Sequence, residues 1–228
     1  MTTVFIISAP SGSGKSTLVN ELRSRVGGLK FSVSYTTRPP RGSEVNGREY
    51  FFVPRSEFED MIARDEFLEY AQVFGNYYGT ARRFLREAQQ SGDDLLLDID
   101  VQGAAQIKNK IPDAASVFVL PPDRQTLEWR LRHRGEDPEA VICRRLDTAR
   151  REIENYDKYD YILVNDRLET SVDQLKAIVL SERMRHSGRP LSVEDQAVRA
   201  AAEQCRLHRV RDRLQPILES FRDGQSQR

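Results

Sequence analysis

The sequence has few of the features that mark exported, membrane-spanning or nucleic-acid-coating proteins. It contains only 2 cysteines, Cys143 and Cys205, with no C-x-x-C spacing. This favours reduced thiols in a reducing compartment over a disulfide framework. No apolar run approaches the ~20 residues that a membrane span needs. The 35 basic residues are balanced by 35 acidic ones, so DNA or another bulk polyanion is not an implied partner.

Internal repeats, low-complexity tracts and clusters of metal-ligand residues are also missing from the sequence. The N-terminus enters an apolar segment directly, without the charged region and cleavage site of a secretory signal. What remains is an ordinary globular composition, 39% hydrophobic and 31% charged over 228 residues, enough for one sizeable core with small inserted lobes. We therefore expect a cytoplasmic protein.

The stretch with the most defined chemistry spans residues 4–17. Val4–Ile7 predicts a buried strand, Ser11–Gly14 is a glycine-rich turn, and helical apolar spacing begins at Leu18. With Lys15 between turn and helix, this arrangement is typical of a phosphate-binding P-loop. Ala9 stands where the usual pattern has glycine, which is a mild deviation because alanine can replace glycine where φ is negative.

The residue types in this loop suit a polyphosphate. Glycines let the backbone N–H groups point inward, and the following helix presents its positive end to an anion. Lys15 supplies a cation for the β- and γ-phosphates, and Ser16 offers a hydroxyl to Mg²⁺. The loop predicts binding of a nucleoside triphosphate, but by itself it does not name the reaction.

The rest of the chain alternates apolar strand patterns with helical patterns. This predicts a parallel sheet with helices on both faces. Residues 35–80 interrupt the alternation and predict a small β-rich lobe, in which Ser56–Glu59 has the form of a helix-capping box. An arginine-rich pair of helices over about 124–150 predicts a lid. The five predicted strands lie at residues 4–7, 29–34, 95–100, 115–120 and 161–165.

Several polar residues stand in unusual places. Arg38 and Arg41 lie in a proline-rich loop, and they predict either a phosphate clamp or a solvated basic loop. Glu69 lies on an apolar strand face, where a carboxylate is costly without a partner. Asp98 and Asp100 end a buried strand, and they predict either a site for Mg²⁺ water or phosphate-binding arginines, or two helix caps.

The lid arginines and the C-terminal region also leave alternatives open. The dense arginines of the lid predict either closure over an anion or a solvated helix face. Near the C-terminus, Ser192–Asp195 has capping-box form, and a helix is predicted from there to about Leu214, before Pro216. That helix could pack on the core, pair with another copy or stand in solvent.

Taken together, the motifs resemble those of guanylate kinases of the bacterial type, and they follow in order from residue 1 to about 185. Among these motifs, Ala9 matches a form found in many bacterial members. The motifs are residues 9–17 (APSGSGKST), 34–38 (SYTTR) with Arg41, 45–52 (VNGREYFF), 69–71 (EYA), 75–80 (GNYYGT), 98–103 (DIDVQG), 134–135 (RG) and 164–166 (VND).

The resemblance implies a fold and an activity. The fold is a P-loop three-layer α/β/α architecture with a five-stranded parallel core sheet, an inserted β-rich GMP-binding lobe and a helical lid. The activity is transfer of the γ-phosphoryl group of ATP to GMP, and also to dGMP, with Mg²⁺. The implied domains are a kinase-like domain (1–187), with core segments 1–34, 81–123 and 151–187, lobe 35–80 and lid 124–150, followed by a helical extension (188–228).

The resemblance also assigns roles to matching positions. ATP would be bound by Ala9, Pro10, Ser11, Gly12, Ser13, Gly14, Lys15, Ser16 and Thr17, with Asn165 near adenine. The GMP phosphate would be held by Arg38, Arg41, Tyr50 and Tyr78, and guanine would be read by Ser34, Glu69 and Thr80. The transferring group would be surrounded by Lys15, Arg38, Arg130, Arg134 and Arg145. Asp98 and Asp100 would contribute to the GMP site and orient its arginines, with Ser16 on Mg²⁺ and Asp98 reaching the metal through water.

Two rival functions remain open from the sequence. A kinase for another monophosphate is disfavoured by Ser34 and Glu69. A non-catalytic guanylate-kinase-like interaction module is disfavoured because the phosphate-binding residues are retained. Arg167 departs from the acidic residue that many members have there, which puts the detail of the adenine pocket in doubt. Expected partners are ATP and GMP, with no nucleic acid or membrane, and homo-oligomers could form through the C-terminal helix.

Overall fold

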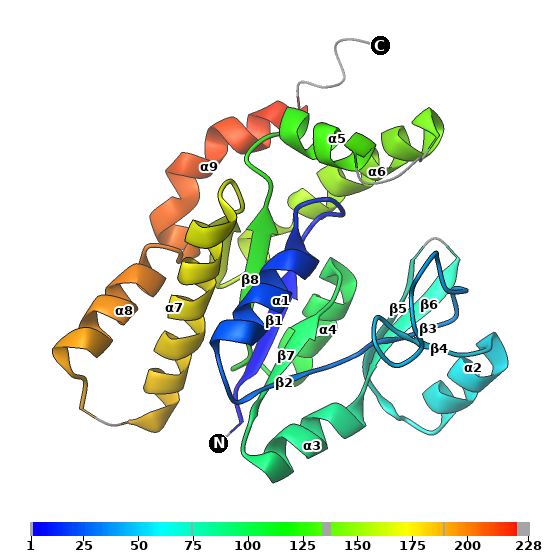
Figure 1. The fold of residues 1–228 in the computed structure, drawn as a ribbon, viewed down its shortest axis with the longest axis horizontal. Coiled ribbons are helices and arrows are strands. Elements are labelled where there is room, and N and C mark those ends of the chain that lie inside the picture. The colour runs from blue at the N-terminus through cyan, green and yellow to red at the C-terminus, as the bar shows by residue number, and fades with distance from the viewer. Residues whose placement is uncertain (1, 74, 134–137, 189, 223–228) are drawn as a thin grey trace. The chain divides into compact units, whose positions relative to one another are not determined.

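The computed structural model describes residues 2–73, 75–133, 138–188 and 190–222, and it contains the predicted five-stranded parallel sheet (Figure 1). The strand order is β2-β7-β1-β8-β9. In β8 every residue is buried, as expected for a strand covered on both faces. The strands are β1 (Val4–Ser8), β2 (Leu29–Phe31), β7 (Asp94–Asp98), β8 (Ala115–Leu120) and β9 (Tyr161–Val164).

The chain divides into two compact units, and the division falls inside β1. The first unit comprises Met1–Ile6 and Gly28–Ala114, and the second comprises Ile7–Gly27 and Ala115–Arg228. The parallel pairing of β2 with β7 lies in the first unit, and that of β8 with β9 lies in the second.

The first unit carries a second sheet with the order β4-β3-β6-β5. Its apolar side is built on Phe58, Met61 and Phe67. The strands are β3 (Tyr35–Thr36), β4 (Phe51–Phe52), β5 (Phe67–Val73) and β6 (Asn76–Ala81), and the helices of this unit are α2 (Arg55–Ala63), α3 (Arg82–Ser91) and α4 (Val101–Lys110). The predicted capping box at Ser56–Glu59 is wrong, because α2 already begins at Arg55, after Pro54, without a side-chain cap.

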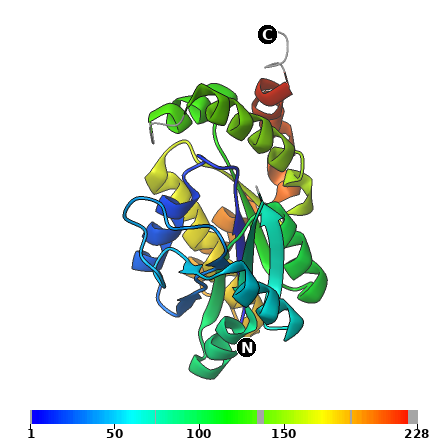
Figure 2. The ribbon, with the colours of Figure 1, turned by 90° about the vertical axis from the view of Figure 1, so that its right-hand side faces the viewer.

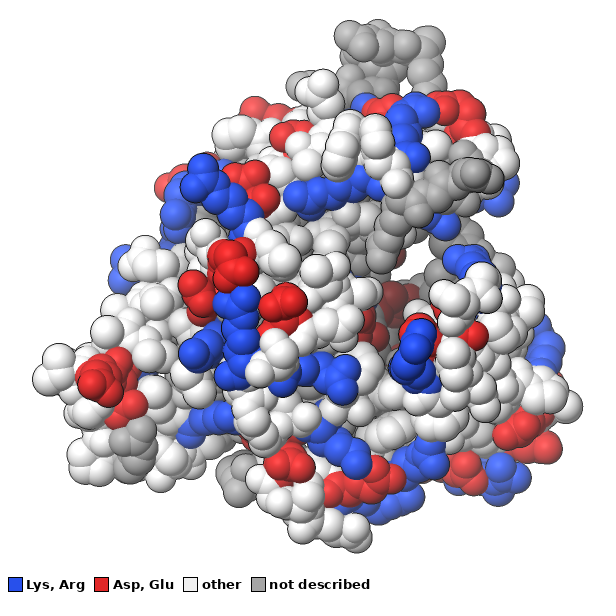
Figure 3. Space-filling view, in the orientation of Figure 1, with Lys and Arg blue, Asp and Glu red and all other residues white. Residues whose placement is uncertain are grey.

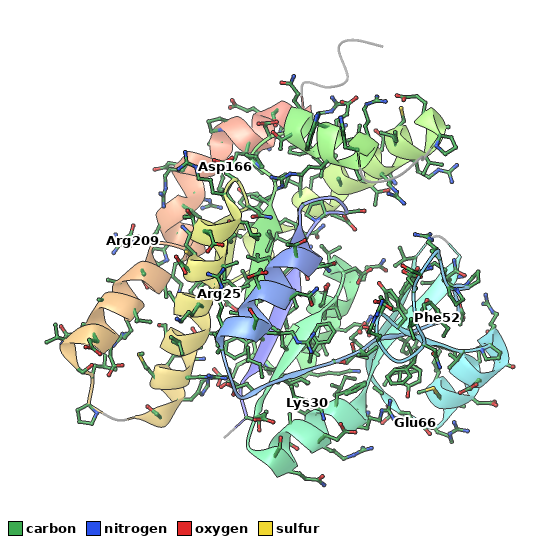
Figure 4. All side chains as sticks on the ribbon, viewed as in Figure 1. Arg25, Lys30, Phe52, Glu66, Asp166 and Arg209 are labelled. Atoms are coloured by element: carbon green, nitrogen blue, oxygen red, sulfur yellow. The ribbon has the colours of Figure 1, made fainter. Side chains whose placement is uncertain are left out.

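In the second unit, helix α7 packs against both α1 and α8 (Figures 1 and 2). The helices of this unit are α1 (Lys15–Arg25), α5 (Arg124–His133), α6 (Glu139–Ile153), the short 3-10 helix η1 (Tyr156–Lys158), α7 (Leu168–Ser187), α8 (Val193–Glu203) and α9 (Leu207–Arg222). Arg25 of α1, labelled in Figure 4, pairs with Glu169 at 2.9 Å, on the first turn of α7.

The C-terminal prediction needs a correction. The capping box of Ser192 and Asp195 is confirmed, but the single helix to about Leu214 is wrong. Two helices form instead, and Pro216 lies inside α9. A proline costs a helix one backbone hydrogen bond. Buried Leu214 and Leu218 flank it on either side, and their packing outweighs that loss.

None of the described helices is both long enough and apolar enough to cross a membrane.

Candidate active site

The glycine-rich loop between β1 and α1 has the backbone of an anion site. Gly12 and Gly14 have φ of +94° and +87°, a region that glycine adopts without strain. Inside the loop, the Ser13 N–H donates to the carbonyl of Pro10 at 3.1 Å. The first turn of α1 has no acidic residue and no side-chain cap. The N–H groups of a helix's first turn point out of its N-terminal end, and the positive end of the helix dipole there favours an anion.

Three side chains, those of Leu127, Leu131 and Asn165, approach the loop so closely that a Cβ on Gly12 or Gly14 would force them to shift. A Cβ on Gly12 would lie 2.9 Å from methyl carbons of both Leu127 and Leu131, which project from α5. A Cβ on Gly14 would lie 2.5 Å from Nδ2 of Asn165. Helix α5 and the end of β9 are therefore packed directly on the loop.

Asn165 and Arg130 hold the loop by its main chain. The Asn165 amide donates to the carbonyl oxygen of Ser13 at 2.7 Å. Arg130 donates to the carbonyl of Asn165 at 3.0 Å and reaches the Ser13 carbonyl at 3.5 Å. The connection between β9 and α7, marked by Asp166 in Figure 4, thus starts with Asn165, whose side chain holds the glycine-rich loop in place. Arg130 brings a fixed positive charge to the same place.

A separate cluster in the first unit is centred on Glu69 of β5. Its side chain is buried, with the residue only 3% exposed. Its Oε1 accepts a hydrogen bond from the Thr80 hydroxyl at 2.6 Å, across the β5–β6 pairing. The pKa of Glu69 is raised to about 7, mainly by burial; the Thr80 hydrogen bond lowers it and the nearby charge of Asp100 raises it, and both effects are included in that value. A carboxylate held in this state is poised to accept donors from a ligand.

The first turn of α4 makes room for this carboxylate. A Cβ on Gly103 would lie 2.5 Å from Oε2 of Glu69, so a larger residue there would have to displace the carboxylate. Asp100 caps α4 by accepting from the Gly103 N–H at 2.8 Å. Further along α4, Gln106 donates to the carbonyl of Tyr70 at 2.7 Å, which ties α4 to the strand that carries Glu69. The sequence analysis gave Gly103 no role, although glycine in a helix is unfavourable enough to signal one.

Arg38 forms the second part of this unit's cluster. It is 6% exposed, donates to Glu44 at 2.9 Å, and places its guanidinium carbon 5.4 Å from the centre of the Tyr50 ring. A second ring, that of Phe52 (labelled in Figure 4), lies 5.7 Å from the same carbon. Burial, the largest single influence, lowers the pKa of Arg38, but the hydrogen bond to Glu44, the charge of Glu44 and the nearby Tyr78 together outweigh it, so the pKa is raised. The Tyr78 ring lies 5.8 Å from that of Tyr50.

Glu44 is a site residue that the sequence analysis missed. One of its oxygens accepts from Arg38, and the other accepts from the backbone N–H of Arg41 at 2.7 Å. The hydrogen bond from Arg38 lowers the pKa of Glu44, so it is anionic. A carboxylate bridging two predicted phosphate-binding positions could have been suspected from its place three residues after Arg41. Arg38 is not part of a merely solvated loop, whereas Arg41 is exposed.

Comparison with known proteins explains why a glycine-rich loop and a buried carboxylate occur in one chain. A family model described as guanylate kinase matches residues 1–182. The chain belongs to the guanylate kinase family. It is 61% identical over 225 residues to the guanylate kinase of Koribacter versatilis, covering 97% of each chain. It is 50% identical over 187 residues to that of Escherichia coli K12, covering 81% of this chain and 90% of the relative.

A solved structure supports the same relationship. The crystal structure of guanylate kinase from Anaplasma phagocytophilum superimposes with a TM-score of 0.68 at 34% identity, covering 80% of this chain and 87% of that one. The P-loop α/β fold implied by the sequence motifs is therefore that of the guanylate kinase family.

The remaining site residues predicted from the family motifs are placed as follows. Lys15 and Ser16 occupy the first turn of α1, with Ser16 exposed, and Arg145 is half-buried on α6. Ser34 accepts through its carbonyl from the Phe51 N–H at 2.9 Å. Asp98 is half-buried at the end of β7. Arg134 lies outside the described residues.

Asp100 and Asn165 make contacts in the structure that differ from the main roles predicted for them. Asp100 is a helix cap, which confirms that alternative for this residue. A capping role for Asp98, and the action of either carboxylate on arginines or Mg²⁺, stay predictions. Asn165 bonds to the donor loop, and its place near adenine also stays a prediction. Within the described part of the chain, no group of three or more His, Cys, Asp and Glu side chains could hold a metal ion by itself.

Proposed function

We propose that this chain transfers the γ-phosphoryl group of ATP to GMP, giving ADP and GDP, and that it also accepts dGMP. The observation that carries the proposal is Glu69, a buried carboxylate with a hydroxyl on one oxygen and a glycine against the other. In a member of the guanylate kinase family, such a carboxylate can accept the hydrogen bonds that guanine donates.

Guanine offers two neighbouring donors, N1–H and the 2-amino group, and a carboxylate accepts both. Adenine has an acceptor at N1 and no 2-amino group, so it would leave Glu69 desolvated and unpaired. Sites built from buried polar groups can reject such an analogue by ~10⁴-fold or more. Thr80 and Ser34 complete the guanine site in this proposal, and Thr80 also orients the Glu69 carboxylate.

The phosphate of GMP is assigned to a cationic and hydroxyl cluster. Arg38 is held ready by Glu44 and stacked beside aromatic rings, so a dianionic phosphate would compete with Glu44 for a guanidinium already desolvated. Arg41, Tyr50 and Tyr78 provide the other donors. A phosphate oxygen of GMP then attacks the γ-phosphorus of ATP directly, and no protein nucleophile is required.

The donor half is assigned to the glycine-rich loop, with Lys15 on the β- and γ-phosphates. Phosphoryl transfer depends on positioning and on neutralising charge. Arg130, already fixed beside the loop, supplies part of that charge, and Arg134 and Arg145 are proposed to supply the rest from a lid spanning residues 124–150. These retained groups favour catalysis over a role as an interaction module. We also propose the domain boundaries predicted from the sequence, with the core, the GMP-binding lobe and the lid within residues 1–187 and the extension from residue 188.

The residues present fit an ATP-bound Mg²⁺. This ion keeps several waters and usually takes only one or two protein ligands besides substrate phosphates. The exposed hydroxyl of Ser16 in the first turn of α1 meets that need, with Asp98 reaching the ion through water. Bound Mg²⁺ would neutralise charge on the phosphates of ATP.

The distribution of charge and burial bears on two other kinds of partner, nucleic acids and a second copy of the chain. Basic and acidic side chains are interspersed over the face in Figure 3, which supports a protein without a nucleic-acid partner. Association through the C-terminal helix remains a proposal, and the apolar residues of α9 (Val210, Leu214, Leu218 and Phe221) are buried within the chain itself.

The test is a coupled assay of ADP production with ATP and Mg²⁺, run with GMP, dGMP, AMP and UMP. We expect turnover with the guanine nucleotides alone and a relaxed GMP/AMP ratio in Glu69→Gln. Glu66→Gln is the matched control, since Glu66 (labelled in Figure 4) pairs with Arg64 at the surface at 2.6 Å. Equal turnover of GMP and AMP by the unaltered protein, or none with GMP, would contradict the proposal.

A further inference from the structure

The C-terminal segment (residues 190–222) lies beyond the part of the chain that matches the family model, which ends at residue 182. The Escherichia coli relative aligns over 187 residues, whereas the Koribacter versatilis relative aligns over 225. The segment therefore lies outside the part of the chain that defines the family. Its contacts in the second unit indicate what it adds.

The segment first closes the open edge of the sheet. β9 is the last strand in the sheet order, and an edge strand leaves backbone groups unpaired. Between α8 and α9 the chain pairs with it, because the Ile162 N–H donates to the carbonyl of Cys205 at 2.8 Å and the Leu207 N–H donates to that of Asp160 at 3.2 Å. This pairing also explains why α8 and α9 are separate helices.

A buried ionic cluster fixes the same junction. The side chain of Glu182 on α7 is only 3% exposed and accepts from Arg206 at 3.0 Å and from Arg185 at 2.7 Å. It also accepts from the hydroxyl of Tyr161, whose ring lies 4.0 Å from the guanidinium carbon of Arg206. Removing one of its partners would leave an uncompensated buried charge, which is costly. The start of α9 is thus anchored firmly to β9 and α7.

From this anchor, α9 reaches the beginning of α5 (Figure 1). Arg124 is the first residue of α5, and the N–H of a first helical residue has no partner within its own helix. It donates to Oγ of Ser220 in α9 at 3.1 Å. The Ser220 hydroxyl donates in turn to the Ile217 carbonyl at 2.6 Å, which leaves its lone pairs for Arg124. Asp123 caps α5 by accepting from the Thr126 N–H at 2.6 Å, and α9 adds an acceptor for the Arg124 N–H.

Besides packing on α6, helix α5 contacts the donor loop. Leu127 and Leu131 stand against Gly12, and Arg130 bonds to the carbonyls of Ser13 and Asn165. Helix α5 is held at its start by α9 and along its length by the loop. We propose that α9, through Ser220 and α5, is a positioning element for the ATP-binding loop, so that the C-terminal segment sets the affinity for ATP and not for GMP.

The test compares three variants of the full chain. Ser220→Ala removes the acceptor of the Arg124 N–H at the start of α5, Ser220→Thr keeps the hydroxyl, and Ser192→Ala removes the cap of α8 in the same segment. Ser192 accepts from the Asp195 N–H at 3.1 Å and so caps α8, a helix other than α5. Calorimetric titration gives the dissociation constants for MgATP and GMP, and hydrogen exchange reports on residues 124–133.

We expect Ser220→Ala to weaken MgATP binding by about three- to tenfold, as expected for one lost hydrogen bond. Exchange in the first turn of α5 should rise while GMP binding stays unchanged. Ser220→Thr should restore MgATP binding. Ser192→Ala should lower the melting temperature and leave both affinities unchanged. If Ser220→Ala lowers only the melting temperature, or weakens ATP and GMP equally, α9 is a stabilising cover and the proposal is wrong.

Discussion

The region around the glycine-rich loop and the region around Glu69 are built on opposite principles. The loop presents backbone N–H groups, and the neighbouring side chains of Asn165 and Arg130 donate to the carbonyl of Ser13 within it. The Glu69 region presents side-chain groups, and the backbone serves to make room for them, as at Gly103. The first region depends on main-chain shape, and the second depends on charge and burial.

This difference predicts how each region fails. Where main-chain groups bind the substrate, the most damaging change adds a carbon atom and removes no functional group. Where a buried carboxylate binds the substrate, function depends on the protonation of that carboxylate, because its pKa is raised to about 7, mainly by burial. Variants that add one methyl group, and a change of pH, therefore separate the two regions.

The largest effect is expected for Gly14→Ala. The variant must place a side chain at φ of +87°, and its Cβ would lie 2.5 Å from Nδ2 of Asn165. Since Asn165 holds the Ser13 carbonyl, the loop and its holder must both shift. Misplacement of this kind can cost about 10²-fold. We expect the dissociation constant for MgATP to rise by about that factor while GMP binding is kept, as measured by titration calorimetry.

Gly92→Ala provides the matched control for this change. Gly92 also has positive φ, +75°, but a Cβ there meets nothing within 4 Å. This variant carries the backbone strain without the collision, so it should lose stability and retain affinity for MgATP. Similar MgATP binding by Gly14→Ala and Gly92→Ala would show that the contact with Asn165 does not shape the loop.

A smaller effect, on the other ligand, is expected for Gly103→Ala. Gly103 lies in a helix, where alanine is favoured by up to about 1 kcal/mol. Its Cβ would nevertheless lie 2.5 Å from Glu69 Oε2 and displace the carboxylate. We expect KM for GMP to rise by about tenfold or more, as for a lost charged hydrogen bond, without a change in the dissociation constant for MgATP.

Gly27→Ala is the comparison for Gly103→Ala, because a Cβ on Gly27 meets nothing within 4 Å. It should leave the KM values for both substrates unchanged. A Gly103→Ala protein with normal GMP kinetics would mean that Glu69 can move without loss, which would remove the side-chain half of the comparison.

The smallest effect is a pH dependence confined to GMP. Guanine requires the ionised form of Glu69, whose pKa in the free protein is about 7. Apparent GMP affinity should therefore fall by about tenfold per pH unit below that value. The phosphate of GMP also titrates near pH 6, but it does so equally with Glu69→Gln. The difference between the two proteins, measured from pH 5.5 to 8, isolates Glu69.

The same ionisation affects the stability of the free protein. The native pKa of about 7 lies above the ordinary value of 4.5, so between them the native state binds more protons than the unfolded state. The free energy of unfolding should fall as pH rises through this window, by about 3 kcal/mol in total. Denaturant titrations should show this slope, and Glu69→Gln should reduce it. An unchanged slope in the variant would assign the dependence to other groups.

The two regions also differ in how far the sequence predicts them. The glycine-rich loop is continuous in the chain, so the residue types and spacing of residues 9–17 are enough to identify a phosphate-binding loop. Glu69 is anomalous on an apolar strand face, but its partners are identified only with the help of the family motifs. Gly103 and Glu44 were missed as site residues, because their roles are contacts with residues distant along the chain or with backbone groups.

The sequence by itself determined the alternation of strands and helices, the parallel sheet and the phosphate loop. These follow from hydrophobic spacing and from glycines close together in the chain, which are local properties. Only the tertiary structure decided the pKa of Glu69, the fixing of Ser13 by Asn165 and Arg130, and the division of the C-terminal segment into α8 and α9. Each of these depends on burial and pairing between segments far apart in sequence, where packing outweighs local preference, as it does at Pro216.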